Sequence, residues 1–198
     1  MNHLGTVTLE TERLILRPFQ LEDASDMYHN WAGSKLVTKF LGWPAHTSVE
    51  ESRKILDTWV KNYADPKYYE WCLESKENNQ AIGSMGVVKV DESIEAVEIG
   101  YCIGESYWHK GMTAEALQAV VRFLFEQVGC NRISANHDIN NPNSGKVMKK
   151  AGLQYEGTLL QAGKSNAGIF DMAVHGITRA MYFARFSGEF AAETRRNT

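Results

Sequence analysis

The chain has 198 residues, of which 43% are hydrophobic, so it can bury one sizeable core and falls at the upper end of single-domain length. Its formal net charge of −3, from 21 basic and 24 acidic residues, excludes the broad positive field that direct nucleic-acid binding usually needs. The three cysteines lack disulfide or metal-ligand spacing, and no apolar run suits a signal sequence or a membrane span, so we expect a cytoplasmic protein without a metal.

The hydrophobic pattern and the turn residues divide the chain into strands and helices, with no linker between domains. In chain order we expect a strand at residues 13–17, helices at 21–31 and 48–64, strands at 68–75, 80–90 and 96–103, a helix at 112–128, a strand at 131–137, a helix at 143–151, and strands at 153–161 and 169–178. This order indicates an α/β (α+β) fold in which about seven strands form a central mixed sheet flanked by about four helices. We expect one domain, residues 1–198, with a core over residues 8–182 and a tail, residues 183–198, that frays or packs on the body or on a second subunit.

A loop that holds a glycine lies between the expected strand at residues 96–103 and the helix that begins near residue 112. Backbone N–H groups at a helix start form an anion site together with the helix dipole, and Gly111 lets a phosphate approach the backbone closely. The residues predicted to hold a pyrophosphate here are His109, Lys110, Gly111, Met112 and Thr113. The Thr113 hydroxyl is expected to cap the helix and to meet a phosphate oxygen. A glycine that only turns the chain before an ordinary helix is the alternative.

Two blocks of the sequence resemble motifs of one protein family. Residues 98–101 and 108–116 resemble the acetyl-CoA signature of the GNAT superfamily, in the version of its ribosomal-protein alanine N-acetyltransferase branch. Residues 141–153 are similar to the later Asn-x-x-Ser motif of that branch, and the resemblance extends over most of residues 8–182. The chain departs from the branch at Leu160, where many relatives have arginine, and this departure bears on the acceptor.

The resemblance implies a GNAT-like fold, with a mostly antiparallel, twisted sheet whose fourth and fifth strands splay apart, and with acetyl-CoA as co-substrate. It also implies that backbone groups of Tyr101, Cys102 and Ile103 hold the pantetheine arm and face the oxyanion. Asn141 would bind pantetheine or order the turn before the next helix. Direct transfer needs a neutral amine, a stabilised oxyanion and a proton for the thiolate, but neither a metal nor a covalent nucleophile.

A base must take a proton from the acceptor amine, and strand alternation selects a candidate for it. A period of two places Glu98 and Cys102 on one face of the expected strand and Tyr101 on the other. Glu98 is therefore the first catalytic candidate, as a base that acts through water, and Asp138 is the reserve. A structural carboxylate at the strand start is the alternative for Glu98. His137 ends a strand and is interpreted as structural.

The proton donor for the thiolate cannot be the residue that many GNAT enzymes use. They have a tyrosine seven residues after the motif asparagine, and this chain has Met148 there, whose thioether cannot donate. Ser144 is therefore the second catalytic candidate, because its hydroxyl would hydrogen bond the thioester sulfur and so contact the cofactor. A cap at the helix start is the alternative for Ser144.

The acceptor is expected to be a primary amine, and the resemblance favours the N-terminal α-amine of a protein such as a ribosomal protein. A small amine (a polyamine, an antibiotic or an amino acid) and a non-catalytic acyl-CoA-binding protein are the alternatives. An aromatic cluster in the first half is expected to be mostly core and partly acceptor wall: Trp31, Phe40, Trp43, Trp59, Tyr63, Tyr68, Tyr69 and Trp71. We expect a monomer or homodimer that binds neither nucleic acid nor membranes.

Overall fold

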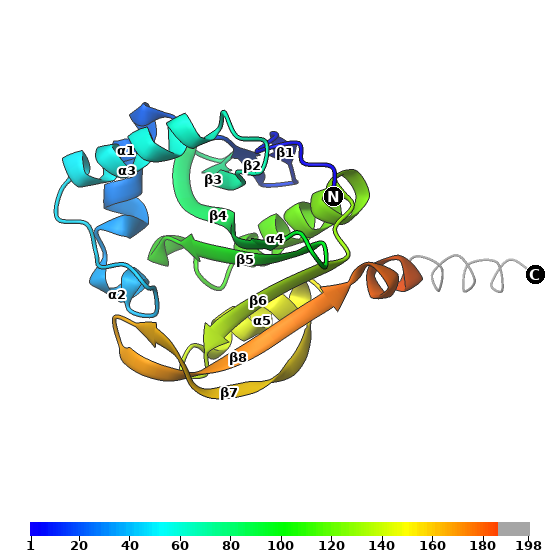
Figure 1. Cartoon of the computed structure of the whole chain (residues 1–198). Helices are drawn as coiled ribbons and strands as arrows, with labels where there is room; N and C mark the ends of the chain where they lie inside the picture. Colours follow the sequence, from blue (N-terminus) through cyan, green and yellow to red (C-terminus); the bar gives the residue numbers. More distant parts are fainter. Residues whose placement is uncertain (186–198) are drawn as a thin grey trace, which may run out of the picture.

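An eight-stranded, twisted sheet forms the centre of the protein, in the order β1-β2-β3-β4-β5-β6-β8-β7 (Figure 1). The structure, a computed structural model, describes residues 1–185. The strands are β1 (Leu9–Glu10), β2 (Leu14–Arg17), β3 (Glu70–Ser75), β4 (Gln80–Asp91), β5 (Ala96–Ile103), β6 (Arg132–Asp138), β7 (Gln154–Ser165) and β8 (Gly168–Thr178). Neighbouring strands are antiparallel except β5 and β6, which are parallel. The predicted fold class is confirmed, with the two-residue β1 as an extra strand that is too short to show a periodicity.

Five α-helices accompany the sheet within the described chain, and residues 179–185 are helical again. They are α1 (Ala24–Met27), α2 (Lys35–Thr38), α3 (Val49–Asn62), α4 (Met112–Phe123) and α5 (Pro142–Lys150). The helix predicted at residues 21–31 is interrupted, because a 3₁₀ turn precedes α1 and a π-helical turn follows it. The four residues of α2 are too few to show a helical period, so no pattern predicts it. Within residues 1–185 no helix is long and apolar enough to cross a membrane.

The helix α4 buries one side against the sheet, as its apolar spacing predicts. Leu117, Val120 and Val121 are at most 1% exposed and share one core cluster with Ile99 of β5 and Ile133 of β6. Each fully buried side chain of this kind stabilises the fold by about 1.5–3 kcal/mol. This packing holds the N-terminal end of α4 close to the end of β5.

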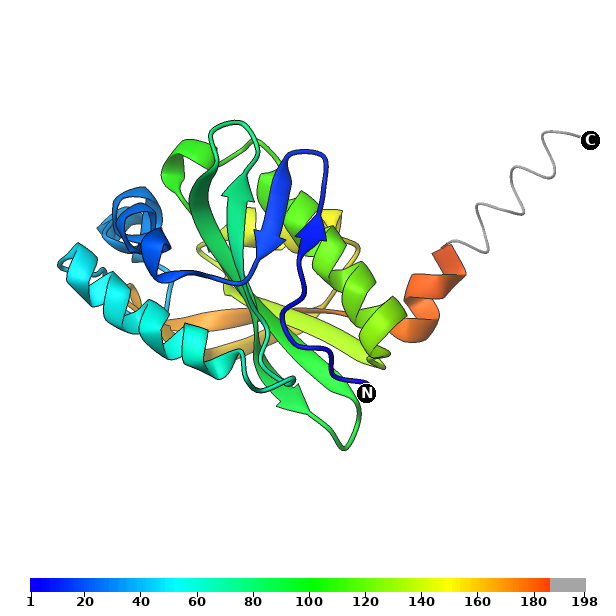
Figure 2. The same cartoon turned by 90° about the horizontal axis from the view of Figure 1, so that it is seen from above.

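The helices α1 and α3 lie on the opposite face of the sheet from α4 (Figure 2). Met27 and Leu56 from these helices pack there with Phe19, Trp31 and Cys72, and all five are at most 2% exposed. The strands β3 and β4 are therefore covered on both faces. Side chains on these strands are held in place by their neighbours above and below.

The strands β5 and β6 separate after three paired positions. Their pairing runs from Ala96↔Arg132 to Glu98↔Ser134, although β5 continues to Ile103. Because β1 was not expected, the predicted fourth and fifth strands are β5 and β6, and the predicted splay is confirmed. Beyond Glu98, this edge of β5 faces α5 rather than a strand of the described chain, so backbone groups on that edge are available to a ligand.

The hairpin of β7 and β8 reaches across to the segment around α2 (Figure 1). At its tip the backbone N–H of Asn166 donates to the carbonyl oxygen of Leu41 at 3.1 Å. The Asn166 side-chain nitrogen donates to the carbonyl oxygens of Thr38 at 2.8 Å and Trp43 at 2.7 Å. Two segments up to 128 residues apart in sequence therefore meet at one end of the sheet.

The chain after β8 packs on the body as far as Arg185, whose guanidinium donates to the Gly152 carbonyl oxygen. The Tyr182 ring stacks on Phe125 with 4.9 Å between ring centroids, and its hydroxyl donates to Glu126 Oε1 at 2.7 Å. The expectation for the tail at residues 183–198 lies, from residue 186 on, outside the described residues.

Candidate active site

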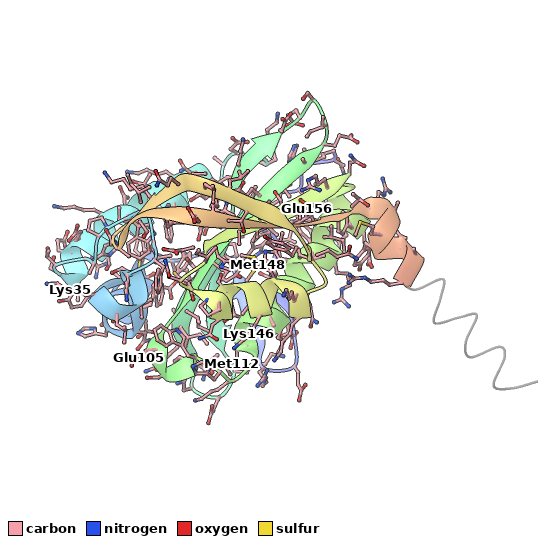
Figure 3. All side chains as sticks on the ribbon, turned by 90° about the horizontal axis from the view of Figure 1, so that it is seen from below. Lys35, Glu105, Met112, Lys146, Met148 and Glu156 are labelled. Carbon is pink, nitrogen blue, oxygen red and sulfur yellow. The ribbon has the colours of Figure 1, made fainter. Side chains whose placement is uncertain are left out.

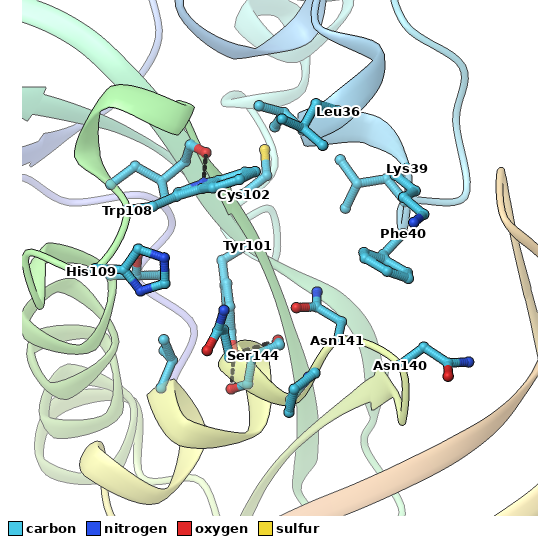
Figure 4. Close-up of a pocket in the computed structure, with 17 residues that line it drawn as sticks. Leu36, Lys39, Phe40, Tyr101, Cys102, Trp108, His109, Asn140, Asn141 and Ser144 are labelled. Carbon is cyan, nitrogen blue, oxygen red and sulfur yellow. Dashed lines mark hydrogen bonds between the residues drawn. The ribbon is translucent and has the colours of Figure 1, made fainter.

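A pocket of about 320 Å³ opens where β5 leaves β6 (Figure 4). Its lining comes from the end of β5 with the loop after it, from the start of α5, and from residues 36–41 around α2. The predicted site residues that line it are Tyr101, Cys102, Ile103, His109, Thr113, Asn141 and Ser144. The fold therefore brings together most of the side chains that the two motifs select.

Tyr101 and Ser144 form a hydrogen-bonded pair across the splay (Figure 4). The Tyr101 hydroxyl donates to the Ser144 carbonyl oxygen at 3.0 Å and lies 2.9 Å from the Ser144 Oγ. Burial raises the pKa of Tyr101, so its hydroxyl stays protonated at neutral pH. Because its one proton goes to the carbonyl, the phenol oxygen can accept the proton of the Ser144 hydroxyl. This bond orients Ser144 at the pocket wall.

Asn141 occupies the N-cap position of α5, and its side chain makes no capping bond there. Its backbone orders the turn, since its N–H donates to the Asp138 carbonyl oxygen at 2.7 Å and its carbonyl oxygen accepts from the Ser144 N–H at 3.1 Å. The alternative of Ser144 as the helix cap is therefore wrong. The amide of Asn141 points into the pocket (Figure 4) and is available to a ligand.

The N-terminus of α4 has the geometry of an anion site. Gly111 is its N-cap, in the left-handed region with a φ of 80°, and no described side chain caps the helix, so the first backbone N–H groups are free. Thr113 is the second helical residue, so the prediction that its hydroxyl caps the helix is wrong, and the residue lines the pocket instead. The Arg13 guanidinium donates to the Lys110 carbonyl oxygen at 2.9 Å and pairs with Glu115 of α4 at 2.6 Å, so it fixes this loop to the helix.

The other predicted loop residues, Met112, Lys110 and His109, lie in three different surroundings. Met112 packs in the core with 6% exposure, so only its backbone N–H is free to face a phosphate. The Lys110 side chain lies over the Tyr107 ring, with Nζ 5.3 Å from the ring centroid. His109 lines the pocket with a positive φ of 61°, a conformation that residues with a Cβ rarely adopt.

Glu98 lies on β5 at the last position that pairs with β6, outside the pocket lining. Its Oε1 accepts a hydrogen bond from Asn136 Nδ2 at 2.8 Å. Asp138 accepts two hydrogen bonds from Asn140, at 2.8 Å from the backbone and 3.0 Å from the side chain, and so holds the turn before α5. The His137 ring hydrogen bonds the Asp138 carbonyl oxygen at 2.8 Å. Asp138 and His137 thus have structural partners, and the role of Glu98 as a base stays a prediction.

Met148 and the aromatic residues divide between the core and the pocket wall. Met148 lies on the side of α5 that faces the sheet (Figure 3) and is 1% exposed in the core, so it does not line the pocket. Of the aromatic cluster, Trp31 is fully buried as expected, and Phe40 lines the pocket. Trp108 also lines it and donates from Nε1 to the Ile103 carbonyl oxygen at 2.9 Å. Trp108 lies within the motif at residues 108–116, but the sequence does not predict that it lines the pocket, because a tryptophan is as common in a core as in a pocket wall.

Cys102 is the one pocket residue with a thiol. Its Sγ lies 3.5 Å from Ser84 Oγ on the neighbouring strand β4. Burial raises the pKa of the Cys102 thiol to about 11. The thiol is therefore protonated at neutral pH and is a poor nucleophile.

The chain is similar to known acetyltransferases in sequence and in fold. The sequence profile of the acetyltransferase (GNAT) domain matches residues 13–154. The ribosomal protein uS5-alanine N-acetyltransferase of Escherichia coli (strain K12) is 35% identical over 164 residues, which cover 79% of this chain and 82% of that protein. The uncharacterized N-acetyltransferase p20 of Bacillus licheniformis is 29% identical over 175 residues, or 88% of this chain and 98% of that protein. A solved structure of RimL, a ribosomal L7/L12 α-N-protein acetyltransferase in complex with coenzyme A, has a TM-score of 0.78 at 20% identity and covers 87% of this chain and 98% of its own.

These matches cover the parts of the chain that form the pocket. The profile includes the loop before α4 and the start of α5, and the E. coli relative is similar over most of both proteins. At its low identity the RimL structure supports the fold alone. The chain therefore belongs to the GNAT family and is an acetyl-CoA-dependent N-acetyltransferase.

Proposed function

We propose that the protein transfers the acetyl group of acetyl-CoA to the N-terminal α-amine of a protein such as a ribosomal protein, by direct attack in a ternary complex. The observation that carries this proposal is the Tyr101–Ser144 pair, which lies at the splay in a pocket that extends from the start of α4 to α2. The similarity to an E. coli enzyme whose name specifies the alanine of ribosomal protein uS5 supports this acceptor class.

Acetyl-CoA fits the residues that are present. The free N–H groups at the start of α4 suit its pyrophosphate, and the missing side chain of Gly111 leaves room for a phosphate beside the backbone. The free edge of β5, with Tyr101, Cys102 and Ile103, suits the pantetheine arm, and the Asn141 amide can hydrogen bond it. Acetyl-CoA supplies the activated acetyl group and the thiolate leaving group.

Two proton transfers accompany the proposed reaction. With acetyl-CoA bound, the Ser144 hydroxyl beside Tyr101 turns its one proton from the phenol oxygen to the departing sulfur and so supports it. A carboxylate takes the proton that the acceptor amine must lose before it can attack. Glu98 is the carboxylate that strand alternation predicts, and because it lies outside the pocket lining it would act through water.

The acceptor class can be tested with a panel of substrates. Labelled acetyl-CoA would be incubated with peptides that start with Ala, Ser or Met and with a polyamine, an aminoglycoside and free amino acids. We expect the highest kcat/KM for a peptide. A higher kcat/KM for one of the small amines would favour the small-molecule alternative, and tight CoA binding without acetylation of any acceptor would favour a non-catalytic protein.

We also propose that the protein works in the cytoplasm, as a monomer or homodimer. The described cysteines Cys72, Cys102 and Cys130 are free thiols, which suits a reducing compartment. The proposed partner is the N-terminus of a protein, with no direct contact to nucleic acid or membrane.

A further inference from the structure

Glu70 is a carboxylate to which no role has been given, on the face of β3 that it shares with Cys72. It lies on β3 directly opposite Gly86 of β4, which in turn lies opposite Gly100 of β5. Gly86 leaves its position on β4 without a side chain, whereas the Val88 side chain lies against Gly100. The Glu70 carboxylate occupies the space, since a Cβ built at Gly86 would collide with Glu70 Oε2. The side chain therefore lies over β4, the strand between β3 and β5.

Ser84 connects Glu70 to the pocket. It lies two residues before Gly86 on β4, so it is on the same face and diagonal to Glu70, close enough for its hydroxyl to lower the pKa of the Glu70 carboxylate. Ser84 also pairs with Cys102 across β4 and β5, with 3.5 Å between Oγ and Sγ. Cys102 lines the pocket. A carboxylate and a hydroxyl therefore form a chain from β3 to the pocket wall.

Glu70 also differs from the other carboxylate on this face of β3. Glu74 is paired with Arg17, whose Nε lies 2.5 Å from Glu74 Oε2. Glu70 is half-buried and makes no ion pair within the described chain. A half-buried carboxylate without a cation costs stability, and such groups are found where their chemistry is used.

The surroundings of Glu70 favour its neutral form. The titratable groups that face it are Tyr63 after α3, Tyr68 before β3 and Cys102 on β5, and none of them is a cation. Desolvation raises the pKa of Glu70 to about 8, and the Ser84 hydroxyl opposes part of this rise. A base of this pKa exchanges a proton with a peptide α-amine, whose pKa is about 7.7–8.0, at almost no cost in free energy.

We propose that Glu70 takes the proton from the ammonium group of the acceptor, and that the Ser84 hydroxyl relays it from the pocket. This assignment rests on the proposed acetyl transfer and identifies the carboxylate that serves it. Glu98 is the competing candidate. Neither carboxylate lines the pocket itself, but Glu70 is connected to the pocket residue Cys102 through Ser84, whereas Glu98 accepts a hydrogen bond from Asn136 of β6.

The protons balance within the site. One proton of the acceptor ammonium passes to Ser84 Oγ while the Ser84 proton passes to Glu70, which leaves a neutral amine. The amine nitrogen then forms the bond to the acetyl carbon, and the electron pair of the breaking carbon–sulfur bond stays on the sulfur. The nitrogen loses a second proton and the thiolate gains one beside the Ser144 hydroxyl. The third proton remains on the amide, and Glu70 releases its proton to water.

The test is the pH dependence of the ratio of kcat/KM between the wild type and Glu70→Gln, measured with one acceptor. The ionisation of the acceptor affects both enzymes equally, so its effect on kcat/KM cancels in this ratio. Below the Glu70 pKa of about 8 the variant should be slower by a constant factor of about 100. Above this pH the deficit should shrink about tenfold per pH unit, because free amine needs no base. A purely structural role of Glu70 would not produce this change of slope in the pH profile of the ratio.

Further variants separate the relay from folding. Ser84→Ala should show a deficit with the same pH dependence, and Ser84→Thr, which keeps a hydroxyl, should restore most of the rate. Glu70→Asp keeps the carboxylate, so its kcat/KM should be lower than that of the wild type but should have the same pH dependence. Acetyl-CoA affinity, measured by calorimetry, should match the wild type in each of these variants, which shows that they are folded.

Glu98→Gln is the matched comparison, because it is the same change on β5, the next strand but one in the sheet. Its ratio to the wild type should be independent of pH, whatever its size. A flat ratio for Glu70→Gln, or a bend that appears for Glu98→Gln instead, would overturn the assignment to Glu70. A wild type that acetylates no amine would instead contradict the proposed function itself, so the two failures are distinguishable.

Discussion

Gly111 shapes the proposed phosphate site through its backbone, because its φ of 80° favours glycine. A Cβ there would meet only Arg13 Nη2, at 3.7 Å, so protein atoms leave room for a larger residue. Gly111→Val should nevertheless weaken acetyl-CoA binding by roughly 30-fold, or about 2 kcal/mol, through backbone strain, blocked space and lost N–H contacts. Isothermal titration calorimetry measures this change.

Gly129 is a matched control for this prediction. Its φ is 79°, a Cβ there would meet nothing within 4 Å, and it follows the π-helical turn Leu124–Val128 at the far end of α4. Gly129→Val should introduce similar strain but leave acetyl-CoA affinity at the wild-type value. Unchanged affinity in a folded Gly111→Val would refute the assignment of the loop.

Ser144 tests the proposed support of the departing sulfur. Its hydroxyl lies 2.9 Å from the Tyr101 hydroxyl and does not cap α5, so its removal should leave the helix start intact. Ser144→Ala should lower kcat by about 10-fold, the scale of one hydrogen bond that strengthens in the transition state, with little change in acetyl-CoA affinity. Steady-state kinetics and calorimetry on the same sample separate the two effects. Lost cofactor binding with unchanged kcat would instead indicate a binding role.

Glu70 should also make stability depend on pH. Its pKa is about 8 in the folded protein and returns toward the ordinary 4.5 on unfolding, so folding takes up a proton between these values. The stability that it contributes is full below pH 4.5 and is lost as the pH rises through 8. Glu70→Gln, which never ionises, should therefore raise Tm above that of the wild type at pH 9. The gain should disappear toward pH 5, and an equal gain at both pH values would contradict the raised pKa.

At the scale of elements, the sequence predicts those features whose signal lies within one short segment. The long apolar stripe of α4 predicts its position, and the two motifs select Gly111 and Ser144, because each signal lies within one short segment. The four-residue α2 and the two-residue β1 span less than one period and cannot be predicted in this way. Glu70 is missed for a different reason. Its surroundings depend on the pairing of three strands, which no short segment encodes.

The pairing of strand β2 with β3 is reinforced by a charge cluster. Arg17 binds Glu74 at 2.5 Å and Asp23 at 2.8 Å, and these side chains are only 9–18% exposed. The hydrogen bond from Arg17 to Asp23 is the main cause that raises the pKa of the guanidinium. Arg17→Met should lower the free energy of unfolding by about 3–5 kcal/mol, because two buried carboxylates lose their cation. Urea denaturation measures this loss.

An exposed ion pair is the control for the charge cluster. Lys61 and Asp57 lie one turn apart on α3, and their side chains are 71% and 49% exposed. Lys61→Met should leave the free energy of unfolding nearly unchanged, since solvent already screens the pair. Equal losses for the two variants would mean that burial does not set the strength of the Arg17 cluster.

At the scale of the whole molecule, the β7–β8 hairpin holds the segment around α2, which we propose as the acceptor side of the pocket. Asn166 donates to the carbonyl oxygens of Thr38 and Trp43, on either side of the pocket residue Phe40. Asn166→Ala should loosen this segment and raise the KM for the acceptor several-fold, while acetyl-CoA affinity stays unchanged. The exposed neighbour Lys164 serves as control, since Lys164→Ala removes no contact to the segment. Weaker acetyl-CoA binding in Asn166→Ala would contradict a role confined to the acceptor.

Direct transfer to an N-terminal α-amine is tested most directly by mass spectrometry of one reaction. The protein is mixed with acetyl-CoA and a peptide that starts with Ala, and intact and tandem mass spectra locate the acetyl group at successive times. We predict acetylation of the peptide α-amine, none of the same peptide with a blocked N-terminus, and no acetylated protein at any time, since the Cys102 thiol stays protonated. An acetylated protein that passes its group to the peptide, or acetylation of the blocked peptide, would contradict this mechanism.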